Sequence, residues 1–430
     1  MGQRKLLRCE RIRTSAYYRA LMSAAPSPAV PIHPSVARDA VRDLRASSIR
    51  EVANAGMGRD GILAFWFGEP DEVTPEFIRR AASDALAAGE TFYVQNLGLP
   101  ELRETIASYV SRLHRPITTG NVVVTTSGMT ALAIAEQALI DAGDRVVVVT
   151  PLWPNLVEGP KILGANVATV ALRFDDRGWS LDLDRLLDAL VPGTKALIVN
   201  SPNNPTGWTL SRNEQQAILA HCRTHGIWIV ADDAYERLYY RGMSAGDAGA
   251  DINVAPSFFD LADPEERIVG TNTFSKSWLM TGWRLGWLLA PQALVSDLGK
   301  LVEYNFSCAP AFVQRAGIVA IRDGEPIIAR TRERFAQAQT FLVDALKELP
   351  GVHAAIAPGA MYAFFRVDGV RDSLAFCKAL INAEGLGLAP GIAFGPEGEG
   401  FIRWCYASSV ERLDDGVSRL RRYLQSRRLR

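Results

Sequence analysis

Short apolar runs alternate with longer segments of helical periodicity through the middle of the chain. The runs read NVVVTT (121–126), RVVVVTP (145–151), ANVATVAL (165–172), KALIVNSP (195–202), IWIVADD (227–233) and RIVGTNTF (267–274). Uninterrupted β-branched runs are typical of strands in a parallel sheet that is covered on both faces. Their alternation with helical segments predicts an α/β fold with a doubly wound, mostly parallel sheet.

The clearest helix signal lies at residues 211–226. Ser211 stands at the N-cap position, Glu214 completes a capping box, and the pattern closes on Gly226. The last hundred residues have a different pattern, in which helical segments at 329–349 and 373–385 are interspersed with strand-like runs. This part of the chain is typical of a smaller α+β domain.

These patterns divide the chain into four segments. We expect a flexible leader at 1–30, an N-terminal segment at 31–70, a large domain at 71–325 and a C-terminal small domain at 326–430. Residues 1–21 carry six basic side chains and one acid, which resembles an organelle transit peptide. A simpler interpretation is that Met22 is the true start, and we expect no function for the leader.

Composition excludes several classes of function. The 430 residues include 47 basic and 47 acidic side chains, so overall charge gives no support for nucleic acid or an anionic membrane as a partner. No apolar run is long enough to span a membrane. Five scattered cysteines without CxxC spacing argue against a disulfide framework and predict a reducing, cytoplasmic location.

Polar residues gather where the predicted strands end, which is where ligands bind in open α/β sheets. Ser127 and Gly128 follow the first run and open a helix, so their backbone N–H groups predict an anion site. Asn204 lies in the turn SPNNPTG, and Asp232 ends the run IWIVADD. Each signal is weak alone, because a structural turn or a helix cap would also account for it.

The segment TFSKSWLMTGWRLGW (273–287) places two cations in apolar surroundings. Lys276 can lose its proton if it is buried near other cations, and the neutral amine attacks carbonyl carbon. Arg284 is always charged and suits phosphate. A phosphate-bearing aldehyde would engage both residues, although structural ion pairs would also account for either one alone.

The ordered motifs FGEPDEVTP, YVQNLGLPELR, TSGMTAL, SPNNPTG, DDAYERLYY, SKSWLMTGWRLGW and FIRWCYA carry a resemblance across residues 36–425. The chain resembles the class I/II aminotransferases, the aspartate aminotransferase-like family of fold type I pyridoxal phosphate (PLP) enzymes. The resemblance implies PLP as the cofactor. It also implies a homodimer that moves an amino group from an L-α-amino acid to a 2-oxo acid, with 2-oxoglutarate as one candidate acceptor. Residues 31–70 would then contribute to the small domain and to dimer contacts.

The resemblance also implies a role for each matching residue. Lys276 would form the Schiff base with PLP and move the proton at the substrate's Cα, in a ping-pong reaction. Asp232 would pair with the ring nitrogen, and Tyr235 and Asn204 would bind the phenolic oxygen. The remaining cofactor contacts would come from Trp153 on the ring face, from Ser127, Gly128, Met129, Thr273, Ser275 and Arg284 at the phosphate, and from Tyr93 of the neighbouring subunit.

Arg403 matches the arginine that binds the substrate's α-carboxylate, and Gly68, Trp153 and Asn204 would also lie beside the substrate. Three features depart from the common pattern: Met129 replaces a small, polar or basic residue, Asp233 replaces the more usual glutamate, and bulky Trp66 and Phe67 precede Gly68. The third departure argues against a small acidic substrate and favours a pocket for an apolar or aromatic side chain.

Three alternatives remain open at this point. The same scaffold supports a PLP-dependent β-lyase or another enzyme that labilises the Cα–H bond, because fold does not determine reaction. A non-catalytic PLP-fold binding protein is less well supported, since every catalytic position is present. His221 and His225 have a spacing that can bind metal, but a surface helix face explains them better, and we expect no metal site.

Overall fold

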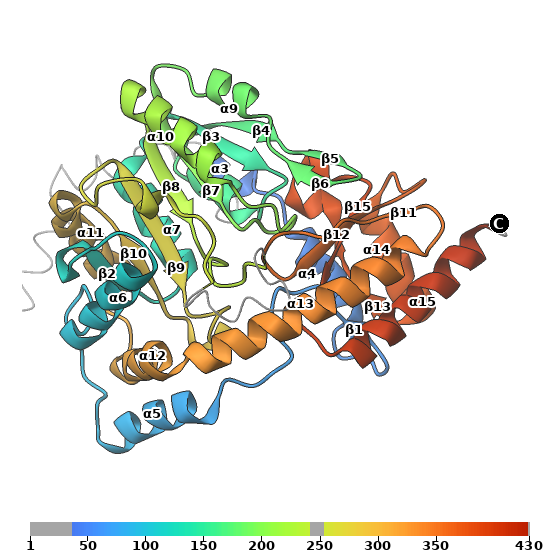
Figure 1. Ribbon diagram of the computed structural model, residues 1–430, viewed down its shortest axis with the longest axis horizontal. Coiled ribbons are helices and arrows are strands. Elements are labelled where there is room, and N and C mark those ends of the chain that lie inside the picture. Colours follow the sequence, from blue (N-terminus) through green and yellow to red (C-terminus); the bar gives the residue numbers. More distant parts are fainter. Residues whose placement is uncertain (1–36, 241–252, 429–430) are drawn as a thin grey trace, which may run out of the picture. The chain divides into compact units, whose positions relative to one another are not determined.

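The computed structural model in Figure 1 describes residues 37–240 and 253–428. The predicted leader therefore lies outside the described residues. The chain forms two compact units, residues 1–44 and 45–430. In the first, the described part contains the single-turn helix α3 (Asp39–Arg42), in which Arg42 and Asp39 form an exposed ion pair. All that follows concerns the second unit.

A seven-stranded sheet forms the centre of the second unit. Its strands, in spatial order, are β2 (Val122–Thr125), β10 (Gly286–Leu289), β9 (Ile268–Thr273), β8 (Trp228–Asp232), β7 (Thr194–Asn200), β3 (Arg145–Thr150) and β4 (Asn166–Ala171). Every neighbouring pair is parallel except those that involve β10, which runs antiparallel to both neighbours. The six predicted strands and the mostly parallel α/β sheet are confirmed; β10 was not predicted.

Both faces of this sheet are buried, as the uninterrupted apolar runs predict. Val122 and Val124 pack into one hydrophobic cluster, while Val123 between them packs into another on the opposite face. The first cluster includes side chains of helices α6 (Pro100–Leu113), α9 (Leu183–Ala189), α10 (Arg212–His225) and α12 (Ala311–Asp323). The second includes side chains of α7 (Gly128–Leu139), α8 (Asn155–Ile162) and α11 (Gln292–Asn305).

A third hydrophobic cluster lies around a four-stranded sheet formed mostly by the end of the chain. The sheet has the order β11 (Val352–His353), β12 (Tyr362–Val367), β15 (Phe401–Cys405) and β14 (Ala389–Pro390). The helices of this cluster are α4 (Ser48–Gly56), α13 (Glu325–Lys347), α14 (Ser373–Glu384) and α15 (Val410–Arg428). The long helix α13 contacts α12 at one end and packs along α15 (Figure 1). The predicted boundaries at residues 70 and 325 stay a prediction.

The remaining elements are short, apart from α5 (Glu76–Ala87), which packs on α12. The two-stranded pairs are β1 (Leu63–Ala64) with β13 (Leu386–Gly387) and β5 (Arg173–Asp175) with β6 (Gly178–Ser180). The 3-10 helices are η1 (Thr119–Asn121), η2 (Phe258–Asp260), η3 (Thr281–Trp283), η4 (Gly391–Phe394) and η5 (Pro396–Gly398).

Gly207 closes the SPNNPTG turn after β7, and its replacement by alanine should destabilise the fold. Its φ is 68°, and an added Cβ would lie 2.5 Å from the carbonyl oxygen of Gly359. Left-handed backbone and a clash with main chain together should lower the free energy of unfolding by about 2–4 kcal/mol. Gly193 is the matched control, because its φ is 88° but nothing lies within 4 Å of an added Cβ. Thermal denaturation of both alanine variants measures the loss of stability. An equal loss in Gly193→Ala and Gly207→Ala would show that the clash with Gly359 does not contribute.

Candidate active site

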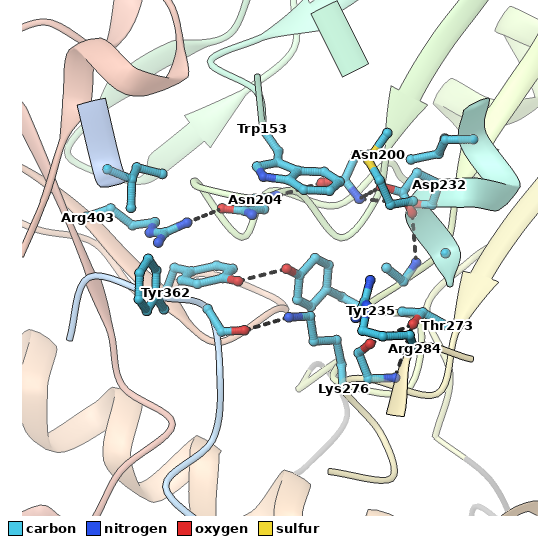
Figure 2. Close-up of a pocket in the computed structure, with 18 residues that line it drawn as sticks. Trp153, Asn200, Asn204, Asp232, Tyr235, Thr273, Lys276, Arg284, Tyr362 and Arg403 are labelled. Carbon is cyan, nitrogen blue, oxygen red and sulfur yellow. Dashed lines mark hydrogen bonds between the residues drawn. The ribbon is translucent and has the colours of Figure 1, made fainter. Parts of the chain in front are cut away.

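Four strands of the large sheet end around one cavity of about 250 Å³ (Figure 2). Strands β7 and β8 deliver Asn200 and Asp232, and β9 ends in Thr273. Gly128 lies three residues after β2, at the start of α7. The complete lining is Ile49, Phe67, Gly68, Gly128, Met129, Leu132, Trp153, Asn200, Asn204, Asp232, Ala234, Tyr235, Thr273, Ser275, Lys276, Arg284, Tyr362 and Arg403. All the predicted site residues except Ser127 and Tyr93 therefore line one cavity.

Lys276 follows β9 and is half-buried at this cavity. Its Nζ donates a hydrogen bond to the Gly68 carbonyl oxygen at 2.5 Å. Burial is the main cause that lowers the pKa of Lys276 to about 8; the positive charges of Arg403 and Arg284 act in the same direction, while nearby Cys405 opposes the shift. A substantial fraction of this amine is therefore neutral near neutral pH, which is the form that attacks carbonyl carbon.

This lowered pKa predicts how Lys276 should react in the cofactor-free protein. An amine-reactive acylating reagent should modify Lys276 half-maximally near pH 8, because the neutral fraction rises as pH passes through the pKa. Lys300 is the control, since its hydrogen bond to Asp297 raises its pKa and its reaction should require higher pH. Mass spectrometry of peptides over a pH series measures both, and equal pH profiles would contradict the shift.

Asp232 is almost completely buried at the end of β8. Desolvation raises the pKa of this carboxyl to about 7, although a hydrogen bond from the Ala234 backbone N–H and the charge of Lys276 oppose the shift. Asn200 Nδ2 donates to Asp232 Oδ2 at 3.2 Å, and Asn200 Oδ1 accepts from the Asn204 backbone N–H at 2.7 Å. An opposite charge facing this carboxylate would favour its ionised form. Asn200 was not predicted as a site residue.

Two tyrosines lie between Lys276 and Arg403 (Figure 2). The Tyr235 and Tyr362 hydroxyl oxygens are 2.7 Å apart and share a hydrogen bond. The Tyr235 ring centroid is 5.8 Å from Lys276 Nζ, and the Tyr362 ring centroid is 4.5 Å from Arg403 Cζ. Tyr362 was also missed, because it comes from β12 of the smaller sheet.

Arg403 presents a buried guanidinium that forms no ion pair with any carboxylate in the described parts of the chain. Its Nη1 donates to Asn204 Oδ1 at 2.9 Å, and its Nη2 donates to the Trp66 carbonyl oxygen at 2.5 Å. Its Nε is buried and has no partner within residues 37–240 and 253–428. A buried cation without a counter-ion is costly, so the site is suited to an anionic ligand at this point.

The opposite side of the cavity has the features of a phosphate site. Helix α7 begins at Gly128, after Ser127, whose Oγ accepts from the Thr130 backbone N–H at 3.0 Å. Thr273 Oγ1 donates to Ser275 Oγ at 2.8 Å. Arg284 is exposed and adds a guanidinium held by its bond to the Thr281 carbonyl oxygen. A phosphate dianion would suit this combination of the α7 N-terminus, the two hydroxyl groups and the Arg284 guanidinium.

The other predicted residues lie as follows. Trp153, Met129 and Gly68 line the cavity, and Trp153 faces it from the side opposite Tyr235 and Lys276 (Figure 2). Ser127 is buried behind the lining as a helix cap. Tyr93 is 90% exposed and lies outside the lining of this cavity.

The charged side chains of the lining indicate which ligands the cavity can bind. Within the described lining the cations are Lys276, Arg284 and Arg403, and the single acid is Asp232. The excess of positive charge matches a ligand set with a phosphate and a carboxylate.

The profile of the family described as aminotransferase class I and II matches residues 62–420. The chain belongs to this family. It is 31% identical over 386 residues to an aspartate aminotransferase of Pyrococcus horikoshii, covering 89% of this chain and 95% of that one. It is 29% identical to the aromatic-amino-acid aminotransferase 2 of Thermococcus litoralis, covering 91% and 99% of the two chains. A single mutant of Thermus thermophilus aspartate aminotransferase superposes with a TM-score of 0.82 at 30% identity, covering 91% and 100%.

The chain is a PLP-dependent aminotransferase of fold type I. The cavity fits PLP, because it combines an amine of lowered pKa, a buried carboxyl and a phosphate-type anion site in one place. The recognition made from the seven motifs is confirmed, and so are the predicted enzyme class and cofactor.

Other features noted in the sequence lie away from this cavity. The rings of His221 and His225 lie with centroids 4.6 Å apart and planes tilted by 52°, and His221 Nε2 hydrogen-bonds the Leu190 carbonyl oxygen at 2.8 Å. Residues 37–240 and 253–428 contain no group of three or more His, Cys, Asp or Glu side chains arranged to bind a metal. The same part of the chain has no helix that is both long and apolar enough to cross a membrane.

Proposed function

We propose that the amino group passes from an L-α-amino acid to a 2-oxo acid by a ping-pong reaction in this one cavity. The observation that carries the proposal is the placement of Lys276 Nζ between a buried carboxyl, Asp232, and a buried guanidinium, Arg403, that has no ion pair in the described chain. An α-amino acid supplies the carboxylate that Arg403 lacks. Bound PLP supplies the electron sink for the electrons left when the Cα–H bond breaks.

Each residue then has a separate task. Arg403 binds the α-carboxylate through two parallel hydrogen bonds and so orients the Cα–H bond. Lys276, as a neutral amine, takes the Cα proton and returns it as an ammonium group. Asp232 would hold a proton at the ring nitrogen of bound PLP, and Tyr235 with Asn204 would bind its phenolic oxygen. The phosphate would be held by Ser127, Gly128, Met129, Thr273, Ser275 and Arg284, while Trp153 would lie against the ring and Gly68 beside the substrate.

The proposal extends to assembly and location. Phe92 and Tyr93 are 83% and 90% exposed, and aromatic side chains of that size are enriched where a second subunit covers them. We place Tyr93 at the phosphate of the neighbouring site in a cytoplasmic homodimer, in which residues 71–325 and 326–430 act as large and small domains.

The test is a visible absorption spectrum of the PLP-loaded protein, titrated with a panel of L-amino acids. Transamination predicts a shift of the cofactor band that added 2-oxo acid reverses. Release of ammonia and a 2-oxo acid with the original band restored, in the absence of any acceptor, would instead assign the protein to the lyases.

A further inference from the structure

Part of the cavity lining has no role in holding PLP or the α-carboxylate, and this part is apolar. Ile49 comes from α4, Phe67 directly precedes Gly68, and Leu132 comes from the second turn of α7. Phe67 is close to the reacting amine, because Lys276 Nζ binds the carbonyl oxygen of the next residue. Gly68 itself has no room for a side chain, since an added Cβ would lie 2.0 Å from the Tyr362 hydroxyl.

The polar groups of the lining either hydrogen-bond one another or are assigned to PLP and the α-carboxylate in the proposed function. Tyr235 and Tyr362 bond each other, Asn204 Oδ1 accepts from Arg403, and Asn200 bridges Asp232 and the Asn204 backbone. Among the cations of the described lining, the phosphate and the α-carboxylate account for Arg284 and Arg403, and Lys276 performs the proton transfer. A second carboxylate on the substrate would therefore lose its water without gaining a counter-ion.

Building on the proposed function, we infer that this enzyme selects amino acids with uncharged, apolar side chains over aspartate and glutamate, and that Ile49 and Phe67 are specificity-determining residues. In a ping-pong reaction both substrates use the same cavity. The same selection therefore applies to the 2-oxo acid, so apolar 2-oxo acids are better acceptors than 2-oxoglutarate.

Trp66 and Phe67 contribute differently to this selection. The Trp66 ring packs against Gly387, where an added Cβ would lie 2.1 Å from it, and only its carbonyl oxygen reaches Arg403. Phe67 faces the cavity, and the Arg50 guanidinium carbon lies 4.7 Å from its ring centroid. Arg50 is exposed and stacks on Phe67, so its charge remains outside the apolar lining.

The test compares kcat/KM of the PLP-loaded enzyme for leucine, phenylalanine, aspartate and glutamate. We expect kcat/KM for the apolar substrates to be higher by at least about 100-fold. A hydrophobic pocket discriminates between substrates that differ by one methylene group by about 10–200-fold, and burying an unpaired charge costs more than that. Phe67→Arg adds a cation to the lining and should reduce this ratio at least about tenfold by raising kcat/KM for aspartate. Phe67→Leu, the matched control, keeps the lining apolar and should retain the preference.

Two results would overturn the inference, and they are distinguishable. Conversion of aspartate or glutamate at least as efficiently as leucine and phenylalanine would refute the selection while leaving transamination intact. Arg50→Gln would then show whether the stacked guanidinium recognises the second carboxylate. Conversion of none of the amino acids would refute the proposed function itself. The wild-type panel decides the matter even if Phe67→Arg fails to fold.

Discussion

Lys276→Ala should lower kcat for transamination by at least about 10⁴-fold. Within the described lining, Lys276 supplies the sole amine, and burial lowers its pKa to about 8. In the proposed function, alanine removes both the nucleophile that would bind the cofactor covalently and the base that would take the Cα proton. The measurement is single-turnover conversion of a good amino acid by the variant, in the presence of excess PLP.

The Lys276→Arg variant tests whether the reaction needs a neutral amine or only a positive charge at this position. Arginine keeps the positive charge and can donate to the Gly68 carbonyl oxygen, but its pKa is too high for it to act as a neutral amine. We expect it to be nearly as inactive as the alanine variant. Lys300→Ala, at an exposed surface lysine, should be indistinguishable from the wild type. Turnover of Lys276→Ala at the wild-type rate would refute the proposed mechanism.

The strands that carry the site were predictable because both faces of the sheet are buried. Val122, Val123 and Val124 supply apolar side chains to both sides, so each run is continuously apolar and its first polar residue marks the sheet edge. The same logic located Asp232, which ends β8. The capping box of Ser211 and Glu214 likewise gave the start of α10 and is confirmed.

The site residues that were not predicted have a local sequence pattern that is also typical of the hydrophobic core. Tyr362 lies in an apolar strand, and Ile49 lies on the buried face of an amphipathic helix, so both had the pattern of ordinary core residues. Only packing of segments more than 200 residues apart brings Ile49 to the same cavity as Lys276. Trp66 and Phe67 were treated alike, but successive residues of extended chain face opposite ways, and only Phe67 lines the cavity.

Strand β10 was missed for a related reason. The segment around Arg284 and Trp287 was interpreted entirely through its chemistry, yet residues 286–289 pair with β9 and β2. This pairing has a functional consequence, because Gly286 passes so close to the start of α7 that an added Cβ would lie 2.5 Å from the Gly128 nitrogen. The strand therefore positions the anion site that the sequence assigned to Arg284 and Gly128.

Asp232→Asn should lower kcat by about 10²–10³-fold, the loss typical of removing one well-placed electrostatic group. Burial raises the pKa of this carboxyl to about 7, so near neutral pH it is only partly ionised until a cation faces it. In the proposed function, the protonated ring nitrogen of bound PLP would provide that cation, and the ion pair would lower the pKa of Asp232 and raise that of the nitrogen. Asparagine can still accept the hydrogen bond from Asn200, but it carries no charge to hold the proton at the ring.

The neighbouring acid provides the matched control for this substitution. Asp233 is also buried, but its Oδ2 accepts a hydrogen bond from Ser257 Oγ at 3.4 Å, and the residue is not part of the cavity lining. Asp233→Asn should therefore change kcat by less than about tenfold, because the Asp233 side chain does not face the cavity in which the ring would bind. Single-turnover rates of the two PLP-loaded variants, compared at the same pH, make the measurement. If Asp232→Asn stayed within tenfold of the wild type, or if Asp233→Asn lost as much, charge at Asp232 would not be what drives the reaction.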